Sequence, residues 1–174
     1  MKPMNLAKYI LLSYVLFSFC TKALAEPLKT AANFTLPNFY TGEMISLESY
    51  KGSVVLVDFW ASWCGPCQAS LPEYEVLRQR LQKSLPKGKF EVLAINVDGN
   101  KEEALAFLNK LQLTFPILKE SSGKSQRDYE LLAMPTSFLV DQKGLIQIAH
   151  VGFNPNYIEL LEKEVLKLVK EHSQ

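Results

Sequence analysis

Two long apolar stretches, at residues 53–61 and 89–98, dominate the pattern of hydrophobic and polar positions. The first, SVVLVDFWA, is an almost unbroken run of β-branched and aromatic side chains, and the second, KFEVLAINVD, is similar. Such runs are typical of central strands that are buried on both faces of a sheet. Residues 66–83, between the two, carry apolar side chains at helical spacing. A helix that joins two strands of one sheet predicts a parallel pair with a right-handed crossover.

The rest of the chain alternates between short strand patterns and helical patterns. Residues 34–52 have the pattern of a small hairpin, residues 100–112 that of a helix, and residues 115–118 that of a short strand. Residues 135–152 predict two antiparallel strands around a turn, and a final helix follows residue 155. We therefore predict an α/β fold with a central mixed β-sheet flanked by helices, an N-terminal β-hairpin and an inserted strand–helix segment.

The N-terminal segment has a different pattern from the rest. A basic start precedes the apolar run at residues 9–20, which is too short to span a bilayer comfortably. Ala23-Leu24-Ala25 then provides the small-x-small pattern that signal peptidase requires. We expect a signal peptide at residues 1–25 that is cleaved, export to the periplasm, and a single domain at residues 26–174. The competing interpretation is an uncleaved signal that anchors the protein in the membrane.

The charge argues against one large class of function. The net charge is +1, and Lys and Arg are scattered among Asp and Glu instead of forming a basic stripe. A nucleic-acid-binding protein normally shows such a stripe, so nucleic acid is not an expected partner. A chain of this length forms one domain with a sizeable core, and we expect it to be a monomer.

The sequence SWCGPC, at residues 62–67, places Cys64 and Cys67 with two residues between them. The third cysteine, Cys20, falls inside the expected signal peptide, so the mature chain keeps only this pair. A disulfide that closes so short a loop removes little entropy from the unfolded chain and stabilises the fold little. Structural zinc requires four ligands, and no second C-x-x-C or H-x-x-x-H supplies the others. No metal site is expected, although Cu(I) binding by the two thiolates stays an alternative.

The position of the pair favours redox chemistry. Cys64 follows directly after a buried strand and stands at the start of a helix. There, free backbone N–H groups and the helix dipole stabilise a thiolate. The i, i+3 spacing brings both sulfurs to one face of the first turn, within reach of a disulfide bond. We therefore expect Cys64 to be the accessible nucleophile and Cys67 the resolving thiol, one turn further into the helix.

The stretch VVLVDFWASWCGPC resembles the active-site signature of thioredoxin, and the downstream MPTSFLVDQKG resembles the proline loop of that superfamily. The exported context, the lead-in at residues 33–52 and the strand–helix segment through residue 112 are similar to the TlpA/ResA-type thiol–disulfide oxidoreductases. The resemblance covers about residues 31–170 and implies a thioredoxin fold.

The resemblance also implies roles for individual residues. Cys64 is the nucleophile and Cys67 the resolving cysteine. The Met134–Pro135 peptide bond is cis, which exposes the Met134 backbone for pairing with an extended client segment. On the same ground, the residues that bind substrate are Trp63, Met134, Pro135 and Thr136.

Two positions bear on how far the TlpA/ResA pattern extends. These reductants often carry a Glu three residues after the second Cys, where this chain has Ser70, and this weakens a link to cytochrome c biogenesis. Asp58 matches the buried acid of thioredoxin, where the exported relatives often have Asn. Because neither face of its strand offers a solvent side, we expect Asp58 to be buried with a raised pKa. Six residues before Cys64, it would accept the proton of Cys67 as that thiol attacks the mixed disulfide.

Together these features predict an exported protein-disulfide reductase. Its partners are client proteins with disulfides and a membrane thiol reductase that donates electrons, and the chain itself needs no cofactor. The Gly-Pro dipeptide between the cysteines resembles the reducing end of the superfamily. Two alternatives stay open: a disulfide oxidant or isomerase, and a copper chaperone or metal-binding module that uses the same cysteine pair.

Overall fold

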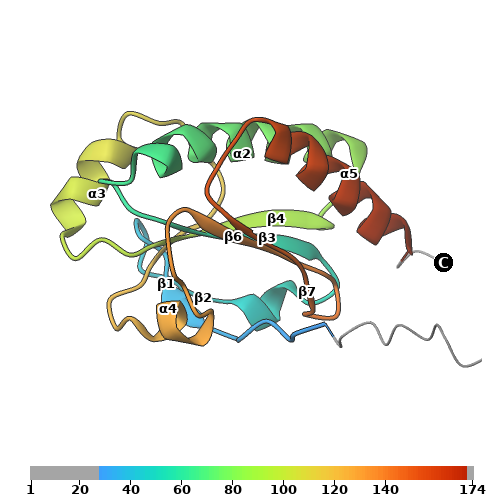
Figure 1. Cartoon of the computed structure of the whole chain (residues 1–174), viewed down its shortest axis with the longest axis horizontal. Coiled ribbons are helices and arrows are strands. Elements are labelled where there is room, and N and C mark those ends of the chain that lie inside the picture. Colours follow the sequence, from blue (N-terminus) through green and yellow to red (C-terminus); the bar gives the residue numbers. More distant parts are fainter. Residues whose placement is uncertain (1–27, 172–174) are drawn as a thin grey trace, which may run out of the picture.

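A mixed five-stranded β-sheet lies at the centre of the fold (Figure 1). Its strands are β3 (Val54–Trp60), β4 (Phe90–Asn96), β5 (Ile117–Lys119), β6 (Thr136–Val140) and β7 (Ile146–Val151). The strand order is β5-β4-β3-β6-β7, with β3 parallel to β4 and antiparallel to β6. β6 and β7 are antiparallel, so the predicted pairings are confirmed. The computed structural model describes residues 28–171, and the expected signal peptide lies outside them.

The two longest helices cover one face of this sheet (Figure 1). The helices of the described chain are α2 (Gly65–Ser84), α3 (Lys101–Leu108), α4 (Lys124–Asp128) and α5 (Asn156–Glu171). α2 and α5 lie side by side above the sheet in Figure 1, whereas α4 lies below it. The predicted strand–helix segment through residue 112 is β4 with α3, and α3 leads into the edge strand β5. Within residues 28–171, no helix has the length and apolar character needed to cross a bilayer.

β3 contributes side chains to two separate hydrophobic cores, because successive side chains of a strand point to opposite faces. Its even-numbered apolar residues pack beneath α2 and α5, in the core that holds Cys67. Its odd-numbered residues pack against the N-terminal segments and Tyr129 on the other face. All seven residues of the strand are buried, as a central strand requires. Asp58 is even-numbered, so its carboxyl group points into the core beneath the helices.

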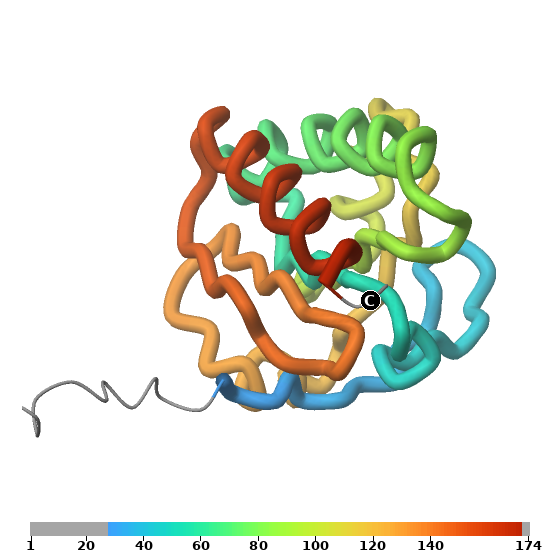
Figure 2. Tube along the Cα trace, turned by 90° about the vertical axis from the view of Figure 1, so that its right-hand side faces the viewer, coloured from blue at the N-terminus to red at the C-terminus, as the bar shows by residue number. Residues whose placement is uncertain are grey.

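An N-terminal hairpin packs on the face opposite the long helices (Figure 2). The Phe39 N–H donates to the Ile117 carbonyl at 2.7 Å, which joins the hairpin to the edge strand β5. The hairpin was predicted, but this contact was not, because a single bridge between short segments leaves no pattern in the sequence. The elements of this region are β1 (Thr35–Pro37), β2 (Met44–Ser46) and the 3₁₀ helix η1 (Leu47–Tyr50).

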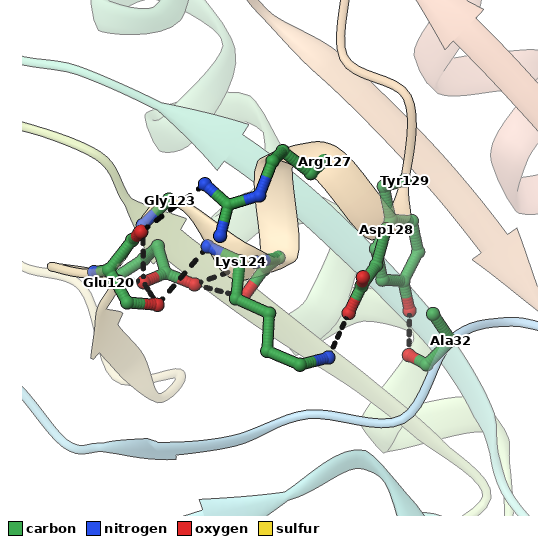
Figure 3. Close-up of polar contacts among 9 residues, drawn as sticks. Ala32, Glu120, Gly123, Lys124, Arg127, Asp128 and Tyr129 are labelled. Atoms are coloured by element: carbon green, nitrogen blue, oxygen red, sulfur yellow. Dashed lines mark hydrogen bonds and ion pairs between the residues drawn. The ribbon is translucent and has the colours of Figure 1, made fainter.

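Glu120 fixes the segment between β5 and β6 (Figure 3). Ser122 and Ser125 each donate both their backbone N–H and their hydroxyl to its carboxylate. Burial alone would raise the pKa of Glu120, but these hydrogen bonds outweigh burial and lower the pKa to about 2. This carboxylate therefore stabilises the fold fully above its ordinary pKa, and the contribution is lost as the pH falls towards about 2. Tyr129 ties the same segment to the N-terminus by donating its hydroxyl to the Ala32 carbonyl at 2.8 Å.

Candidate active site

Cys64 and Cys67 are joined by a disulfide at the start of α2, with their Cα atoms 5.3 Å apart. Cys64 is the N-cap residue of this helix, and its sulfur accepts the backbone N–H of Cys67 at 3.2 Å. Such a hydrogen bond and the helix dipole favour a thiolate at this position once the disulfide is reduced. The exposed fraction is 5% for Cys64 and 0% for Cys67, so only Cys64 reaches the surface in the disulfide form.

Asp98 holds the loop that leads into the cysteine pair. Its carboxylate accepts the Ser62 backbone N–H at 2.8 Å and the Ser62 hydroxyl at 3.0 Å. The Asn96 side chain donates to the same carboxylate at 2.7 Å. Asp98 was not among the predicted site residues. The signal for it was available: parallel strands end at the same edge of a sheet, and Asp98 follows the second buried strand just as Ser62 follows the first.

Asp58 lies on β3 beneath α2 and has no exposed surface. Neither of its carboxyl oxygens has a hydrogen-bond partner among residues 28–171. Burial in this apolar core raises the pKa of Asp58 well above its ordinary value. The predicted burial and raised pKa are therefore confirmed, and the acid lies in the core that also holds Cys67.

α2 places two hydroxyl groups in the same core. Ser70 is fully buried and donates to the Cys67 carbonyl at 3.1 Å. Tyr74 lies one turn further along and is also fully buried. Burial raises the pKa of Tyr74 well above its ordinary value, and the nearby Asp58 raises it further. The Tyr74 phenol and the Asp58 carboxyl therefore share one region of the core.

The loop before β6 contains the predicted cis peptide bond, between Met134 and Pro135. Pro135 is buried, and its carbonyl accepts the Gly152 N–H at 2.8 Å. Met134 is half-buried, and its backbone N–H and carbonyl form no hydrogen bond with the rest of the described chain. The Met134 backbone is thus free to pair with a bound segment.

A groove of about 430 Å³ runs from the residue before Cys64 to this loop. Trp63 and Leu132 line the groove and are 66% and 95% exposed. Large apolar side chains gathered at the surface mark a site for binding another molecule. The remaining lining residues are Val97, Gln126, Leu131, Ala133 and Met134.

Thr136 lies apart from this groove. Its hydroxyl donates to the Ala133 carbonyl at 2.7 Å, which closes the turn of the proline loop. Its side chain lines a second pocket, of about 330 Å³, together with Phe138 and Ala149. The resemblance implied that Thr136 binds substrate, and this stays a prediction. Strand alternation directs its side chain to the face opposite the one under α2. Its direct structural effect is on the shape of the loop.

Metal ligands do not gather anywhere in the described chain. Within residues 28–171, no three His, Cys, Asp or Glu side chains lie close enough together to hold a metal ion. Metal binding at the cysteine pair would therefore use two sulfur ligands from this chain. Two thiolates suit Cu(I) and leave structural zinc incomplete.

Several known proteins are similar to this chain in sequence, and some of them are named thiol–disulfide oxidoreductases. The sequence matches the AhpC/TSA family over residues 27–149, more than half of the chain. It is 38% identical over 125 residues to the thioredoxin-like protein YneN of Bacillus subtilis, covering 70% of this chain and 69% of that protein. It is 30% identical over 118 residues to the thiol–disulfide oxidoreductase ResA of Bacillus thuringiensis, covering 68% of this chain and 65% of that protein. The match thus spans about two thirds of the length of these relatives.

Solved structures agree with this assignment. A protein from Chlorobium tepidum, described as a candidate thiol:disulfide interchange protein DsbE, superposes with a TM-score of 0.74 at 37% identity, covering 82% of this chain and 96% of that chain. StoA from Bacillus subtilis superposes with a TM-score of 0.63 at 29% identity, covering 76% of this chain and 96% of that chain. The chain therefore belongs to the AhpC/TSA family of thioredoxin-like proteins, as a thiol–disulfide oxidoreductase of the ResA and StoA type.

Proposed function

We propose that the protein is exported and reduces disulfides in client proteins, with electrons from Cys64 and Cys67. The observation that carries this proposal is the 3.2 Å contact between the Cys67 N–H and the Cys64 sulfur, at the N-terminus of a 20-residue helix. A sulfur in this position is stabilised as a thiolate at neutral pH. The thiolate is the nucleophile in thiol–disulfide exchange.

The reduction proceeds by two exchanges. The Cys64 thiolate attacks one sulfur of the client disulfide, that S–S bond breaks, and the other client sulfur leaves as a thiolate that takes up a proton. Cys67 then loses its proton and attacks the Cys64 sulfur, which releases the second client sulfur as a thiolate. The Cys64–Cys67 disulfide forms, and two electrons have passed to the client. A membrane thiol reductase returns two electrons to the pair and restores the dithiol.

Asp58 accepts the Cys67 proton in the second exchange. The Cys67 sulfur is buried away from water, so its proton requires an acceptor inside the protein. Asp58 lies in the same core, and its raised pKa brings its proton affinity closer to that of a thiol. Ser70 occupies the position where TlpA/ResA-type reductants often carry a Glu, so the client set we propose is general and is not restricted to cytochrome c biogenesis.

Clients bind as extended segments in the groove between Trp63 and Leu132. The free Met134 backbone supplies hydrogen bonds to the client main chain, as a sheet edge does in β-augmentation. The exposed apolar side chains that line the groove contact client side chains next to the disulfide. The protein acts as a monomer in this scheme, because one chain carries the groove and both cysteines.

The reduction potential tests the proposed direction of the reaction. Equilibration of the Cys64–Cys67 pair with glutathione or dithiothreitol should give a potential close to the thioredoxin value of about −270 mV, and far from the DsbA value of about −120 mV. Insulin reduction should be lost in Cys64→Ser, while Cys67→Ser should accumulate the mixed disulfide on Cys64. A potential near the DsbA value would show instead that the protein is an oxidant.

Asp58→Asn tests the proton acceptor. Since general base catalysis typically contributes about 10²–10⁴-fold, client release near neutral pH should slow by about 10²-fold or more. Attack by Cys64 on the client should keep its rate, because that step needs no proton on Asp58. Rapid-mixing kinetics with a fluorescent disulfide peptide separates the two steps, and release at the wild-type rate would remove Asp58 from the mechanism.

The same variant should change how stability depends on pH. The pKa of Asp58 is raised in the folded state, so its contribution to stability is full below the unfolded pKa and is lost as the pH rises through the folded pKa. Asparagine does not titrate. The free energy of unfolding of Asp58→Asn should therefore exceed that of the wild type by a margin that grows as the pH rises above the ordinary aspartate pKa of about 3.9. A constant margin would contradict the desolvation of Asp58.

Leu132→Ser tests the groove. Loss of this exposed side chain should lower kcat/KM for a protein client about fivefold, the effect of about 1 kcal/mol of contact energy. The rate with a small disulfide that does not fill the groove should stay unchanged. Leu160→Ser is the matched control, because Leu160 is an exposed leucine on α5 outside the groove. An equal loss with both substrates would show that Leu132 affects the cysteines and not client binding.

A further inference from the structure

A row of polar residues crosses the middle of the sheet on the face beneath α2 and α5. Asp58 on β3 pairs directly with Ser137 on β6, and Ser137 pairs with His150 on β7. Residues that pair across neighbouring strands point to the same face, so the three side chains lie on one line across the sheet. The residue on the other side of Asp58 is Ala94 of β4, so the row extends only towards β7.

Tyr157 of α5 covers this row. Its hydroxyl lies 2.9 Å from the Ser137 hydroxyl, and this hydrogen bond is buried. Its ring stacks on the His150 ring with the centroids 3.7 Å apart and the planes 14° from parallel. Burial lowers the pKa of His150, so this ring is neutral at neutral pH and introduces no charge into the row. Stacking and the hydrogen bond together fix the Tyr157 hydroxyl over Ser137.

The hydrogen bond between Ser137 and Tyr157 has two possible directions, since either oxygen can be the donor. When Ser137 donates to Tyr157, its proton points away from Asp58. When Tyr157 donates to Ser137, the Ser137 proton is free to point towards Asp58. Opposed side chains of an antiparallel pair have Cβ atoms about 4.5–5.5 Å apart, so a rotation about side-chain bonds brings the Ser137 hydroxyl to the carboxylate.

We propose that Ser137 is a positioning residue for the proton acceptor: its hydroxyl donates to Asp58 when the carboxylate forms, and to Tyr157 when Asp58 is protonated. An ionised carboxylate in this core is costly without a donor, and the chain Tyr157–Ser137–Asp58 supplies one whose hydrogen bonds strengthen each other. Asp58 keeps the proton that it takes from Cys67 and passes none to Ser137 or Tyr157. This inference rests on the proposed role of Asp58 in the second exchange.

Few other groups that face Asp58 can donate a hydrogen bond to its carboxylate. α2 contributes the Cys67 thiol and the Tyr74 phenol, α5 contributes the Tyr157 phenol, and β6 contributes Ser137. No charged side chain of the described residues offsets the burial of Asp58. Tyr74 is the competing donor, because its hydroxyl lies close to those of Ser137 and Ser70 and its pKa is raised by Asp58.

The test is the pH profile of client release, followed by rapid mixing of the reduced full-length protein with a fluorescent disulfide peptide. In Ser137→Ala the carboxylate loses its donor, so the midpoint of the profile should move to higher pH and release at neutral pH should slow at least threefold. Ser137→Thr keeps a hydroxyl and should restore the wild-type midpoint. Tyr157→Phe should shift the midpoint in the same direction as Ser137→Ala. His150→Phe is the matched control, because it keeps the stacked ring and the hydroxyl pair and should leave the profile unchanged.

The variants separate this inference from the proposed function. A wild-type profile in Ser137→Ala, with slow release in Asp58→Asn, would overturn the role of Ser137 and keep that of Asp58. A shift in Tyr74→Phe and none in Ser137→Ala would assign the donor to Tyr74 and also overturn the inference. If Ser137→Ala slows release equally in an Asp58→Asn background, its effect is structural and the inference fails. Wild-type release in Asp58→Asn would overturn both roles.

Discussion

The burial of the Asp58 carboxyl group, without a hydrogen-bond partner in the described chain, is the constraint on which the other features of the site depend. Both faces of β3 are covered, so the carboxyl cannot turn to water. A carboxyl group in such a core is more easily kept neutral than ionised, which lowers the stability of the fold at high pH. The same desolvation raises the pKa of Asp58 and makes it suited to exchange a proton with a buried thiol. The lower stability at high pH and the capacity for proton exchange therefore have one physical cause, the desolvation of Asp58.

The reactive sulfur is controlled by a different effect. Cys64 stands at the N-terminus of α2, where a backbone N–H and the helix dipole act on its sulfur. The loops around it are held by carboxylates with full sets of donors: Asp98 binds the loop before Cys64, and Glu120 orders the segment that leads to the proline loop. The contrast with Asp58 is informative, because the hydrogen-bonded acids are structural and the acid without partners is the one suited to proton transfer.

The sequence predicted the parts of this structure that depend on local pattern. β3 and β4 follow from their continuous apolar runs, α2 from its periodicity, and the burial of Asp58 from the lack of a solvent side on its strand. The cis bond before Pro135 came from the resemblance alone, since local pattern does not select the isomer. The features that were missed depend on which strands become neighbours.

The order and register of the strands explain why these contacts were not predicted. Asp98 contacts Ser62 because β3 and β4 are adjacent and parallel, and Ser137 lies beside Asp58 because β6 pairs with β3 in one particular register. Neither register is visible in the periodicity of a single strand. Strand alternation directs the Thr136 side chain to the face opposite the one under α2, so a substrate contact at Thr136, which stays a prediction, would lie in the second pocket.

Direct titration of the Asp58 carboxyl group in the oxidised protein tests the central claim, either by carbon-detected NMR of labelled aspartate or by isotope-edited infrared spectroscopy. The structure predicts a pKa well above the ordinary aspartate value of about 3.9, and one that added salt leaves unchanged, because burial and not a neighbouring charge raises it. A midpoint at the ordinary value would contradict the account, since an acid that ionises so readily would be neither desolvated nor matched to the Cys67 thiol.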